Sequence, residues 1–213
     1  YNGALAMISG AEDDKYFRAF MKICDSLRRL KIRTNAETPK DAAKAIQFGA
    51  EGIGLFRTEH MFYGENSEKP LFHLRKMILS DSEKQRRAAL DDLFPFVKSD
   101  IKKTMEVMAG RPVTIRLLDP PLHEFVPENP QERQRLAQSL NISVEKLNSR
   151  AEILHETNPM MGHRGVRLGI TYPEVSEMQI RAILEAAAEL IKEGKKALPE
   201  IMIPVVCDKA EIS

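Results

Sequence analysis

The sequence predicts an α/β fold: a partial TIM-type (β/α)8 barrel with about five of its parallel strands. Short apolar runs alternate with helical patterns, and one strand, one capped helix and a second strand fit within about 25 residues, as in a right-handed βαβ unit. A closed eight-stranded barrel typically takes ~250 residues. Here a leading helix and helical insertions use many of the 213 residues before a fifth strand arrives. We therefore expect an incomplete barrel.

The first part of the chain predicts a helix and then the βαβ unit. Apolar residues recur at helical spacing between positions 13 and 30, which predicts one amphipathic helix. Short strands are expected at 31–35 and 52–56. The helix between them has an N-cap, a proline at its first position and an acid in its first turn, which are Thr38, Pro39 and Asp41.

The middle of the chain predicts helices around a third strand. Residues 68–109 are expected to be helical, and their last helix is expected to run from near Ser99 to Gly110. The apolar stretch 113–118 predicts the third strand. Residues 127–157 predict a polar, helix-rich insertion.

The last part of the chain predicts two more strands around a long helix. A fourth strand is expected near 165–169, although its glycines weaken the pattern. Pro173 opens a long amphipathic helix that Gly194 ends. The nearly continuous apolar run 200–206 predicts a fifth strand that is buried on both faces.

The charge balance argues against nucleic acid as a partner. Lys and Arg total 32 and Asp and Glu total 31, so the net charge is +1. A nucleic-acid binder usually gathers an excess of basic residues into one patch. No apolar run approaches the ~20 residues that a membrane helix needs. We therefore expect neither a nucleic acid nor a membrane as a partner.

The two cysteines are far apart, at Cys24 and Cys207, and have no metal-like spacing. Such sparse usage is typical of a reduced intracellular protein, so a cytoplasmic location is expected, with an organelle as the alternative. Either thiol could be reactive, but no motif surrounds it, and packed or incidental cysteines are preferred. The chain starts at Tyr1-Asn2-Gly3 without an initiating Met, so we expect a piece of something longer.

Three arginines stand where an apolar run gives way to a polar loop: Arg57 in GIGLFRTEH, Arg116 in VTIRLLDPP and Arg164 in NPMMGHRGVR. The guanidinium group is a charged, planar fork of donors that suits phosphate and carboxylate oxygens. Active sites of parallel barrels gather at the carboxyl ends of the strands, where Arg57 and Arg116 are expected. The three arginines predict one site for a small polyanion, and Arg167 competes with Arg164 for the third position.

The same loops carry other polar residues with open roles. Arg57 could instead form an ion pair with Glu59 or Glu51, and Arg116 needs an anionic partner that Asp119 could supply. The loop histidines are His60, His123 and His163. Their spacing matches no common zinc signature, so contacts with an anion or a backbone carbonyl are preferred over a metal site.

Carboxylates are expected at both rims of the barrel. The carboxyl rim is expected to carry Glu59, Asp119 and Glu124, which could bind a metal ion or act in general acid–base catalysis. Glu200 begins its predicted strand and is expected at the opposite rim.

Five stretches of the chain resemble the phosphoenolpyruvate/pyruvate-binding barrel of the pyruvate phosphate dikinases, in the PEP-utilising enzyme family. They are TNAETPKDAAKA, GAEGIGLFRTEHMFY, PVTIRLLDPPLHEFVP, NPMMGHRGVRLGITYPEVSEMQIRAI and PEIMIPVV. Related barrels occur in phosphoenolpyruvate synthase and in the first enzyme of the bacterial sugar phosphotransferase system. These share the RTE-type arginine and an NPxxGxR element, whereas the HMF after Glu59 and the DPPLHEF after Arg116 point to the dikinase branch.

The resemblance implies a three-part enzyme. A nucleotide-binding region passes phosphate from ATP to a histidine of a swivelling domain, which then visits the barrel and phosphorylates pyruvate to phosphoenolpyruvate. The whole enzyme would convert ATP, pyruvate and phosphate to AMP, phosphoenolpyruvate and diphosphate, with Mg²⁺ bridging phosphoryl and enolate oxygens. It implies that Arg57 and Arg116 grip the phosphoryl group and the substrate, and that Arg164 is a third anion contact. A homodimer is expected for the complete protein.

The resemblance also implies that part of the site lies on strands that follow Ser213. The family's metal-binding Glu and Asp and its proton-donating Cys are expected beyond Ser213, and the neighbours of Cys207 do not match that Cys loop. No catalytic or metal-binding residue is therefore assigned here. Residues 1–31 are expected to be the linker and helix from the phosphohistidine domain, and residues 32–213 the incomplete barrel, inactive alone.

Two alternatives to this hypothesis stay open. The chain could belong to a phosphoenolpyruvate synthase or to the first enzyme of the phosphotransferase system. It could also be a non-catalytic module that binds anions or a partner.

Overall fold

At the centre of the molecule is a four-stranded sheet whose neighbouring strands are all parallel, in the order β1-β2-β3-β4. The structure is a computed structural model that describes residues 14–64 and 67–212. The strands are β1 Thr34–Asn35, β2 Ile53–Arg57, β3 Pro112–Arg116 and β4 Leu198–Met202. Parallel strands that pair in chain order are the arrangement of a (β/α) barrel. The α/β class and the partial barrel are confirmed, with four strands in the described residues rather than about five.

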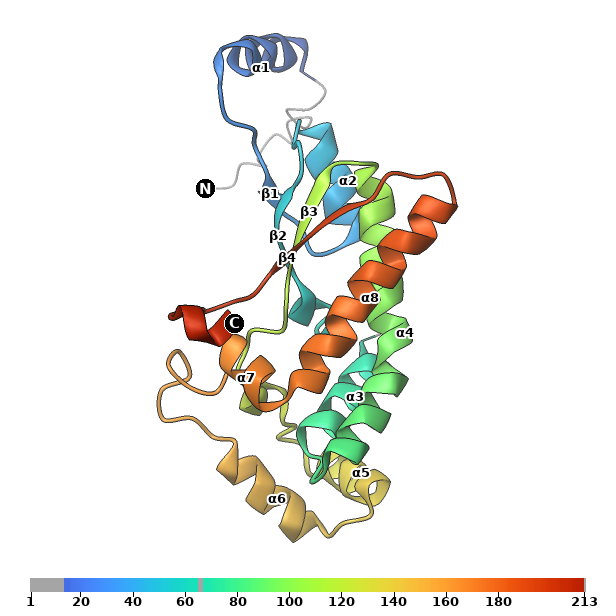
Figure 1. Ribbon diagram of the computed structural model, residues 1–213, viewed down its shortest axis with the longest axis vertical. Coiled ribbons are helices and arrows are strands. Elements are labelled where there is room, and N and C mark those ends of the chain that lie inside the picture. The colour runs from blue at the N-terminus through green and yellow to red at the C-terminus, as the bar shows by residue number, and fades with distance from the viewer. Residues whose placement is uncertain (1–13, 65–66, 213) are drawn as a thin grey trace, which may run out of the picture.

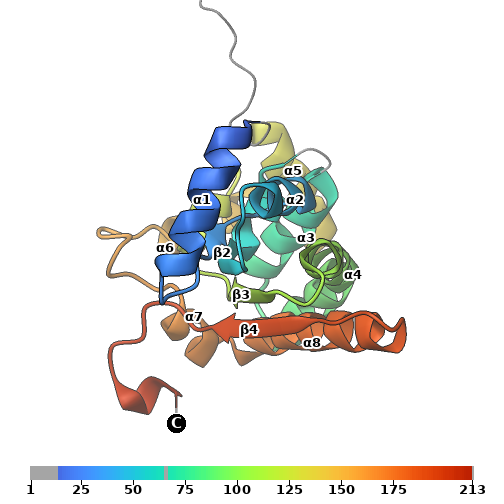
Figure 2. The ribbon, with the colours of Figure 1, turned by 90° about the horizontal axis from the view of Figure 1, so that it is seen from above.

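Helices cover one side of this sheet and extend beyond one end of it (Figures 1 and 2). The helices are α1 Lys15–Leu27, α2 Pro39–Gln47, α3 Glu68–Ile78, α4 Glu83–Met108, α5 Pro130–Leu140, α6 Val144–Ile153, α7 Val166–Thr171 and α8 Pro173–Lys192. Short 3₁₀ turns lie at η2 Thr58–Phe62, η3 Leu122–Phe125 and η4 Lys209–Ile212. In Figures 1 and 2, α2, α4 and α8 lie along one side of the sheet, while α1 stands apart at one end.

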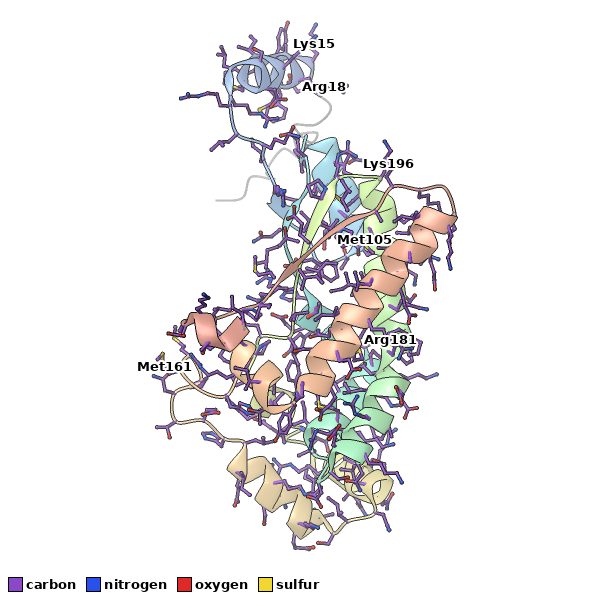
Figure 3. All side chains as sticks on the ribbon, in the orientation of Figure 1. Lys15, Arg18, Met105, Met161, Arg181 and Lys196 are labelled. Carbon is purple, nitrogen blue, oxygen red and sulfur yellow. The ribbon has the colours of Figure 1, made fainter. Side chains whose placement is uncertain are left out.

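The core lies between the sheet and its helices. Along β3, Val113 and Ile115 are each 1% exposed and belong to the core, whereas Thr114 and Arg116 point to the other face and are half-buried. Met105 of α4, labelled in Figure 3, is buried in the same core. The alternation along β3 therefore separates a packing face from a polar face of the sheet.

The first βαβ unit forms as the sequence predicts. The Thr38 hydroxyl accepts a hydrogen bond from the Asp41 backbone N–H at 3.1 Å, and Pro39 occupies the first turn of α2. Strand β2 then pairs in parallel with β1. This unit brings the carboxyl ends of β1 and β2 to the same edge of the sheet.

Helix α4 is longer than predicted, because it begins at Glu83 rather than near Ser99. Its N-cap is Ser82, whose hydroxyl accepts from the Gln85 N–H at 3.3 Å. Pro95 lies inside the helix, where it removes one backbone hydrogen bond. Leu93 and Val97 on either side of it are buried, at 1% and 2% exposure. Tertiary packing of this face outweighs the local signal of the proline.

The fourth predicted strand is wrong, because residues 166–171 form helix α7. Gly165 takes φ +55° and ψ −126°, which breaks an extended chain, and Leu168 N–H then bonds back to the Arg164 carbonyl. A Cβ at Gly165 would lie 2.4 Å from Val205 Cγ2 and 2.9 Å from the Pro204 oxygen. Glycine is therefore required both by the backbone angle and by the close approach of 204–205.

Strand β4 is more exposed than its apolar sequence predicts. Leu198 is 51% and Ile201 39% exposed. Within the described residues β4 pairs with β3 alone, so it is an edge strand and the predicted burial on both faces is wrong. Glu200 is the third residue of the strand rather than its first.

The remaining helices match their predictions. Helix α1 is amphipathic and has no buried residue, and α5 and α6 make up the predicted helical insertion. None of the described helices is long and apolar enough to span a bilayer.

Both ends of the chain lie outside the described residues. Residues 1–13 include the predicted linker end at Tyr1-Asn2-Gly3. Ser213 is the other end, and the metal-binding carboxylates and the proton-donating Cys are predicted to follow it. The predictions that concern the linker end and the residues beyond Ser213 therefore stay predictions.

Candidate functional site

The candidate site lies at the carboxyl ends of β2 and β3. Arg57 is the last residue of β2 and Arg116 the last residue of β3, and the two are partners in the parallel register. Their Cα atoms are therefore neighbours across the sheet. The predicted placement of these two arginines on one rim is confirmed by the geometry.

Arg116 and Arg164 share one buried carboxylate. Asp119 is 4% exposed. Its Oδ2 atom lies 3.0 Å from Arg116 Nη1 and 2.8 Å from Arg164 Nη2. Arg164 Nε lies 3.2 Å from Asp119 Oδ1, so its contact with the carboxylate is bidentate. Glu59, 5% exposed, bonds to Arg116 Nη2. Arg164 therefore joins the rim from the loop before α7, through Asp119.

Arg57 is held by a different carboxylate. Its Nε atom donates to Glu37 Oε1 at 2.7 Å, and its Nη2 atom lies 2.6 Å from the same oxygen. Glu37 follows β1 and is half-buried. The alternatives that paired Arg57 with Glu59 or Glu51 are wrong, because Glu59 pairs with Arg116 and Glu51 with Arg28.

The competing arginine, Arg167, does not join this cluster. Its Nη1 atom donates to the carbonyl oxygens of Met161 and Gly162, at 3.2 and 2.8 Å. These bonds hold the loop that precedes Arg164, whose tip carries Met161, labelled in Figure 3. The geometry thus favours Arg164 over Arg167 as the third arginine of the rim.

The loop histidines form no common centre. His60 is exposed, the His123 ring lies tilted against the His155 ring at 5.5 Å, and His163 lies edge-on to the Tyr172 ring at 5.7 Å. Among residues 14–64 and 67–212, no group of three or more His, Cys, Asp or Glu side chains could hold a metal ion. Glu124 is exposed, and Glu59 and Asp119 are committed to arginines.

The polar face of the sheet carries a further ion pair, away from this rim. Arg33 Nη2 donates to Glu200 Oε1 at 3.0 Å, and Thr114 Oγ1 donates to Glu200 Oε2 at 2.7 Å. The hydrogen bonds from Arg33 and then Thr114 lower the pKa of the Glu200 carboxyl, so it stays ionised. This pair joins the β1 segment to β3 and β4, a structural role.

Neither cysteine belongs to the rim cluster. Both are free, Cys24 is half-buried and Cys207 is exposed. Arg167 Nη2 lies 3.9 Å from Cys207 Sγ. The preference for incidental cysteines agrees with these positions.

Two further residues of the site carry weak sequence signals. Glu37 comes just after a strand end, which is the only hint of its place on the rim. Gln179 is a buried amide of α8 that accepts a hydrogen bond from the Leu118 N–H and donates one to Thr58, the residue after Arg57. The sequence signal for Gln179 is a glutamine on the apolar face of a predicted helix. Hydrophobic periodicity alone does not indicate what such a residue does.

The cluster is suited to binding an anion. Three arginines face three carboxylates, Glu37, Glu59 and Asp119. Within the described residues, no hydrogen bond uses Nη1 of Arg57 or of Arg164. Arg116 Nε and Glu59 Oε2 are buried and have no hydrogen-bond partner there. The rim therefore keeps unused donors beside fixed guanidinium groups, and such donors suit phosphate and carboxylate oxygens.

Comparison with known proteins gives one family for almost the whole chain. Residues 11–213 match the family model described as "PEP-utilising enzyme, PEP-binding domain". The chain is 49% identical over 208 residues to a pyruvate, phosphate dikinase of Clostridium symbiosum, covering 97% of this chain and 23% of that protein. It is 52% identical over 213 residues to the pyruvate, phosphate dikinase of Giardia intestinalis, covering 100% of this chain and 24% of that protein.

A plant relative is similar to the same degree. The chain is 50% identical over 195 residues to the chloroplastic pyruvate, phosphate dikinase 1 of Arabidopsis thaliana, covering 91% of this chain and 20% of the relative. The chain thus spans about a quarter or less of the length of the curated relatives it matches.

Proposed function

The chain belongs to the family of PEP-binding domains of PEP-utilising enzymes, and we propose that it is the part of a pyruvate, phosphate dikinase that binds phosphoenolpyruvate and pyruvate. One observation carries the proposal: Arg57 and Arg116 are register partners at the carboxyl ends of β2 and β3, and Arg164 reaches the same rim through Asp119. Identities of about 50% to dikinases, over nearly all of this chain, support the choice of family branch.

In this proposal the chain takes part in phosphoryl transfer between a phosphohistidine and pyruvate. The P–N bond of the phosphohistidine breaks and a P–O bond forms on the enolate oxygen of pyruvate, so negative charge spreads over the phosphoryl oxygens. Positioning and charge neutralisation do most of the catalysis in such reactions. Arg57, Arg116 and Arg164 are the groups that would hold the phosphoryl and carboxylate oxygens.

The proposal assigns no metal ligands to this chain. Mg²⁺ is expected in the complete enzyme, where it would neutralise phosphoryl and enolate oxygens. The described carboxylates do not fit it, because no group of three or more ligands forms among residues 14–64 and 67–212. Glu59 and Asp119 are paired with Arg116, and no proton donor is proposed among these residues. Both functions are proposed for residues that follow Ser213.

The proposal extends to the whole protein. The expected parts are a swivelling phosphohistidine domain, joined through the segment 1–31, and a barrel that starts at residue 32. A homodimer and a location in the cytoplasm or an organelle are also proposed, and one relative that supports an organelle is named chloroplastic. The overall reaction would convert ATP, pyruvate and phosphate to AMP, phosphoenolpyruvate and diphosphate.

Product analysis of the natural full-length protein tests this function. Incubation with ATP, pyruvate, inorganic phosphate and Mg²⁺ is expected to give phosphoenolpyruvate, AMP and diphosphate. The reaction should stop when inorganic phosphate is left out. Turnover without phosphate would instead identify a phosphoenolpyruvate synthase, and a protein that binds phosphoenolpyruvate without turnover would be the anion-binding module.

A further inference from the structure

We infer that Gln179 positions Arg116 and Asp119 for anion binding, through a hydrogen-bonded bridge between the carboxyl ends of β2 and β3. The inference rests on the proposed function, because it concerns the same arginine site. Gln179 lies on α8 and is 5% exposed. It contacts neither Arg57 nor Arg164 in the described hydrogen bonds, so its role is to hold other groups in place.

Gln179 is a polar residue on the apolar face of its helix. Val175, one turn before it, is 3% exposed, and Ala182 and Ile183, in the next turn, are 0% exposed. An amide in such surroundings is unfavourable unless it is hydrogen-bonded. Packing of α8 alone would be served as well by Met or Leu, so the partners of the amide indicate what this residue does.

Those partners are backbone and side-chain groups at the two strand ends. Gln179 Oε1 accepts from the Leu118 N–H at 3.0 Å, and Gln179 Nε2 donates to Thr58 Oγ1 at 3.1 Å. Thr58 Oγ1 in turn donates to the Arg116 carbonyl oxygen at 3.0 Å. The chain of bonds therefore runs from α8 to the loop after β2, and from there to the last residue of β3.

The donor and acceptor in each of these hydrogen bonds are fixed by the available protons. The Thr58 hydroxyl has one proton, and the Arg116 carbonyl takes it, so the same hydroxyl must accept from Gln179. Turning the amide over would place its NH₂ group against the Leu118 N–H, where no acceptor would remain. A single orientation of Gln179 thus satisfies all the groups.

The bridge holds the backbone that carries the site. The Arg116 carbonyl bonds to Thr58, the Leu117 N–H bonds to the Met202 carbonyl at 3.0 Å, and the Leu118 N–H bonds to Gln179. Asp119 is the next residue, and it aligns Arg116 with Arg164. Misplacement of a binding group by ~1 Å can cost about a hundredfold in rate. Loss of the amide would release this segment while leaving the arginines in the chain.

The test is a set of variants in the natural full-length protein. Gln179→Met keeps the size of the side chain and removes both hydrogen bonds; kcat/KM for pyruvate is expected to fall about ten- to hundredfold. Ile183→Val is the matched control: it removes a buried methyl group from the same helix but no hydrogen bond, and is expected to keep kcat/KM. Thermal unfolding of both variants shows whether their losses of stability are comparable.

A second pair of variants tests the bridge itself. Thr58→Val removes the hydroxyl, whereas Thr58→Ser keeps it and should retain more activity. Because Gln179 and Thr58 act through one chain of bonds, the double variant Gln179→Met/Thr58→Val should lose little more than either single variant.

The outcomes separate this inference from the proposed function. Wild-type kcat/KM in Gln179→Met, an equal loss in Ile183→Val, or losses that multiply in the double variant would overturn the positioning role alone. A wild-type protein that neither binds nor turns over pyruvate or phosphoenolpyruvate would overturn the proposed function, and the positioning role with it.

Discussion

Two regions of the molecule are built from ion pairs, and they differ in burial. On the arginine rim, the side chains of Asp119 and Glu59 are only 6% and 7% exposed. Between α4 and α8, Lys98 and Lys102 contact three glutamates whose side chains are 39–41% exposed: Glu185, Glu189 and Glu193. This second region, the α4–α8 ladder, faces solvent.

Both regions are paired, so the burial of the carboxylates rather than the pairing itself distinguishes the arginine rim from the outer surface. Exposed ion pairs are screened by water and salt, so they contribute little to folding stability and their residues can be substituted at little cost. A buried charge destabilises the folded state unless an opposite charge pairs with it. Removing one partner of a buried pair therefore leaves the other charge uncompensated and lowers the stability of the protein. On the rim, Glu59 and Asp119 hold Arg116 and Arg164 in this buried setting, whereas the side chain of Arg57 is 35% exposed.

The largest effect is expected for Arg116→Met. It leaves Glu59 buried without its cation, which typically destabilises a protein by ~3–5 kcal/mol. Hydrogen exchange of the β2 and β3 amides in the natural protein measures this loss locally. Adding Glu59→Gln to the same protein removes the stranded charge and should recover part of the stability. No change in exchange in Arg116→Met would contradict a buried, paired charge.

Arg57→Ala should lower activity with little loss of stability. Arg57 is 35% exposed in its side chain, so its pair with Glu37 is worth at most about 1 kcal/mol to folding. Each charge-assisted bond to a ligand is worth ~1.5–3 kcal/mol, so kcat/KM for pyruvate should fall about ten- to hundredfold. The control is Arg181→Ala, because Arg181 pairs with Glu185 on the outer side of α8 (labelled in Figure 3). Near-normal activity of Arg57→Ala would sink the assignment of this residue.

The α4–α8 ladder should make the folding stability of the protein depend on pH in the acidic range. Hydrogen bonds from Lys102 and then Lys98 lower the pKa of Glu189 from 4.5 to about 2. Because the pKa is lower in the folded state, the stabilisation is present above pH 4.5 and is lost as the pH falls toward about 2. Hydrogen exchange of α4 and α8 amides at several pH values measures it. Glu189→Gln should flatten this part of the profile, and a profile that is identical in both proteins would refute the prediction.

The smallest effect is expected for Lys98→Met combined with Lys102→Met. Both ammonium groups lie at the surface of the ladder, so salt should weaken their contribution. The difference in thermal midpoint between this variant and the wild type should be small at low salt and shrink further at ~1 M salt. A large fall in the thermal midpoint that is the same at low and high salt would show that the ladder pairs behave like the buried pairs of the rim, which would contradict this prediction.

Local signals in the sequence were enough for part of the fold. Thr38, Pro39 and Asp41 predict the start of α2 because a cap and a first turn involve only neighbours in the chain. The rim positions of Arg57 and Arg116 follow from one rule, that parallel strands end at the same edge. The pairing of Arg116 with Asp119 is also local, since the two residues are three positions apart in the sequence.

Long-range contacts decided the rest. Pro95 remains inside α4 because the helix buries Leu93 and Val97 against distant helices, and Gly165 turns the chain because residues 204–205 lie against it. The bonds of Gln179 cross 61 and 121 positions of sequence. The pairing of Arg57 with Glu37 spans 20 positions. Periodicity and spacing carry no information about such partners.

The central claim is that the rim arginines bind one anion together, and titration calorimetry of phosphoenolpyruvate into the natural full-length protein tests it most directly. Arg164→Ala should raise the Kd by about tenfold or more, since the unused Nη1 donor and its positive charge are lost from the rim. Arg181→Ala should leave the Kd unchanged. An Arg164→Ala protein that binds phosphoenolpyruvate as tightly as the wild type would contradict the account.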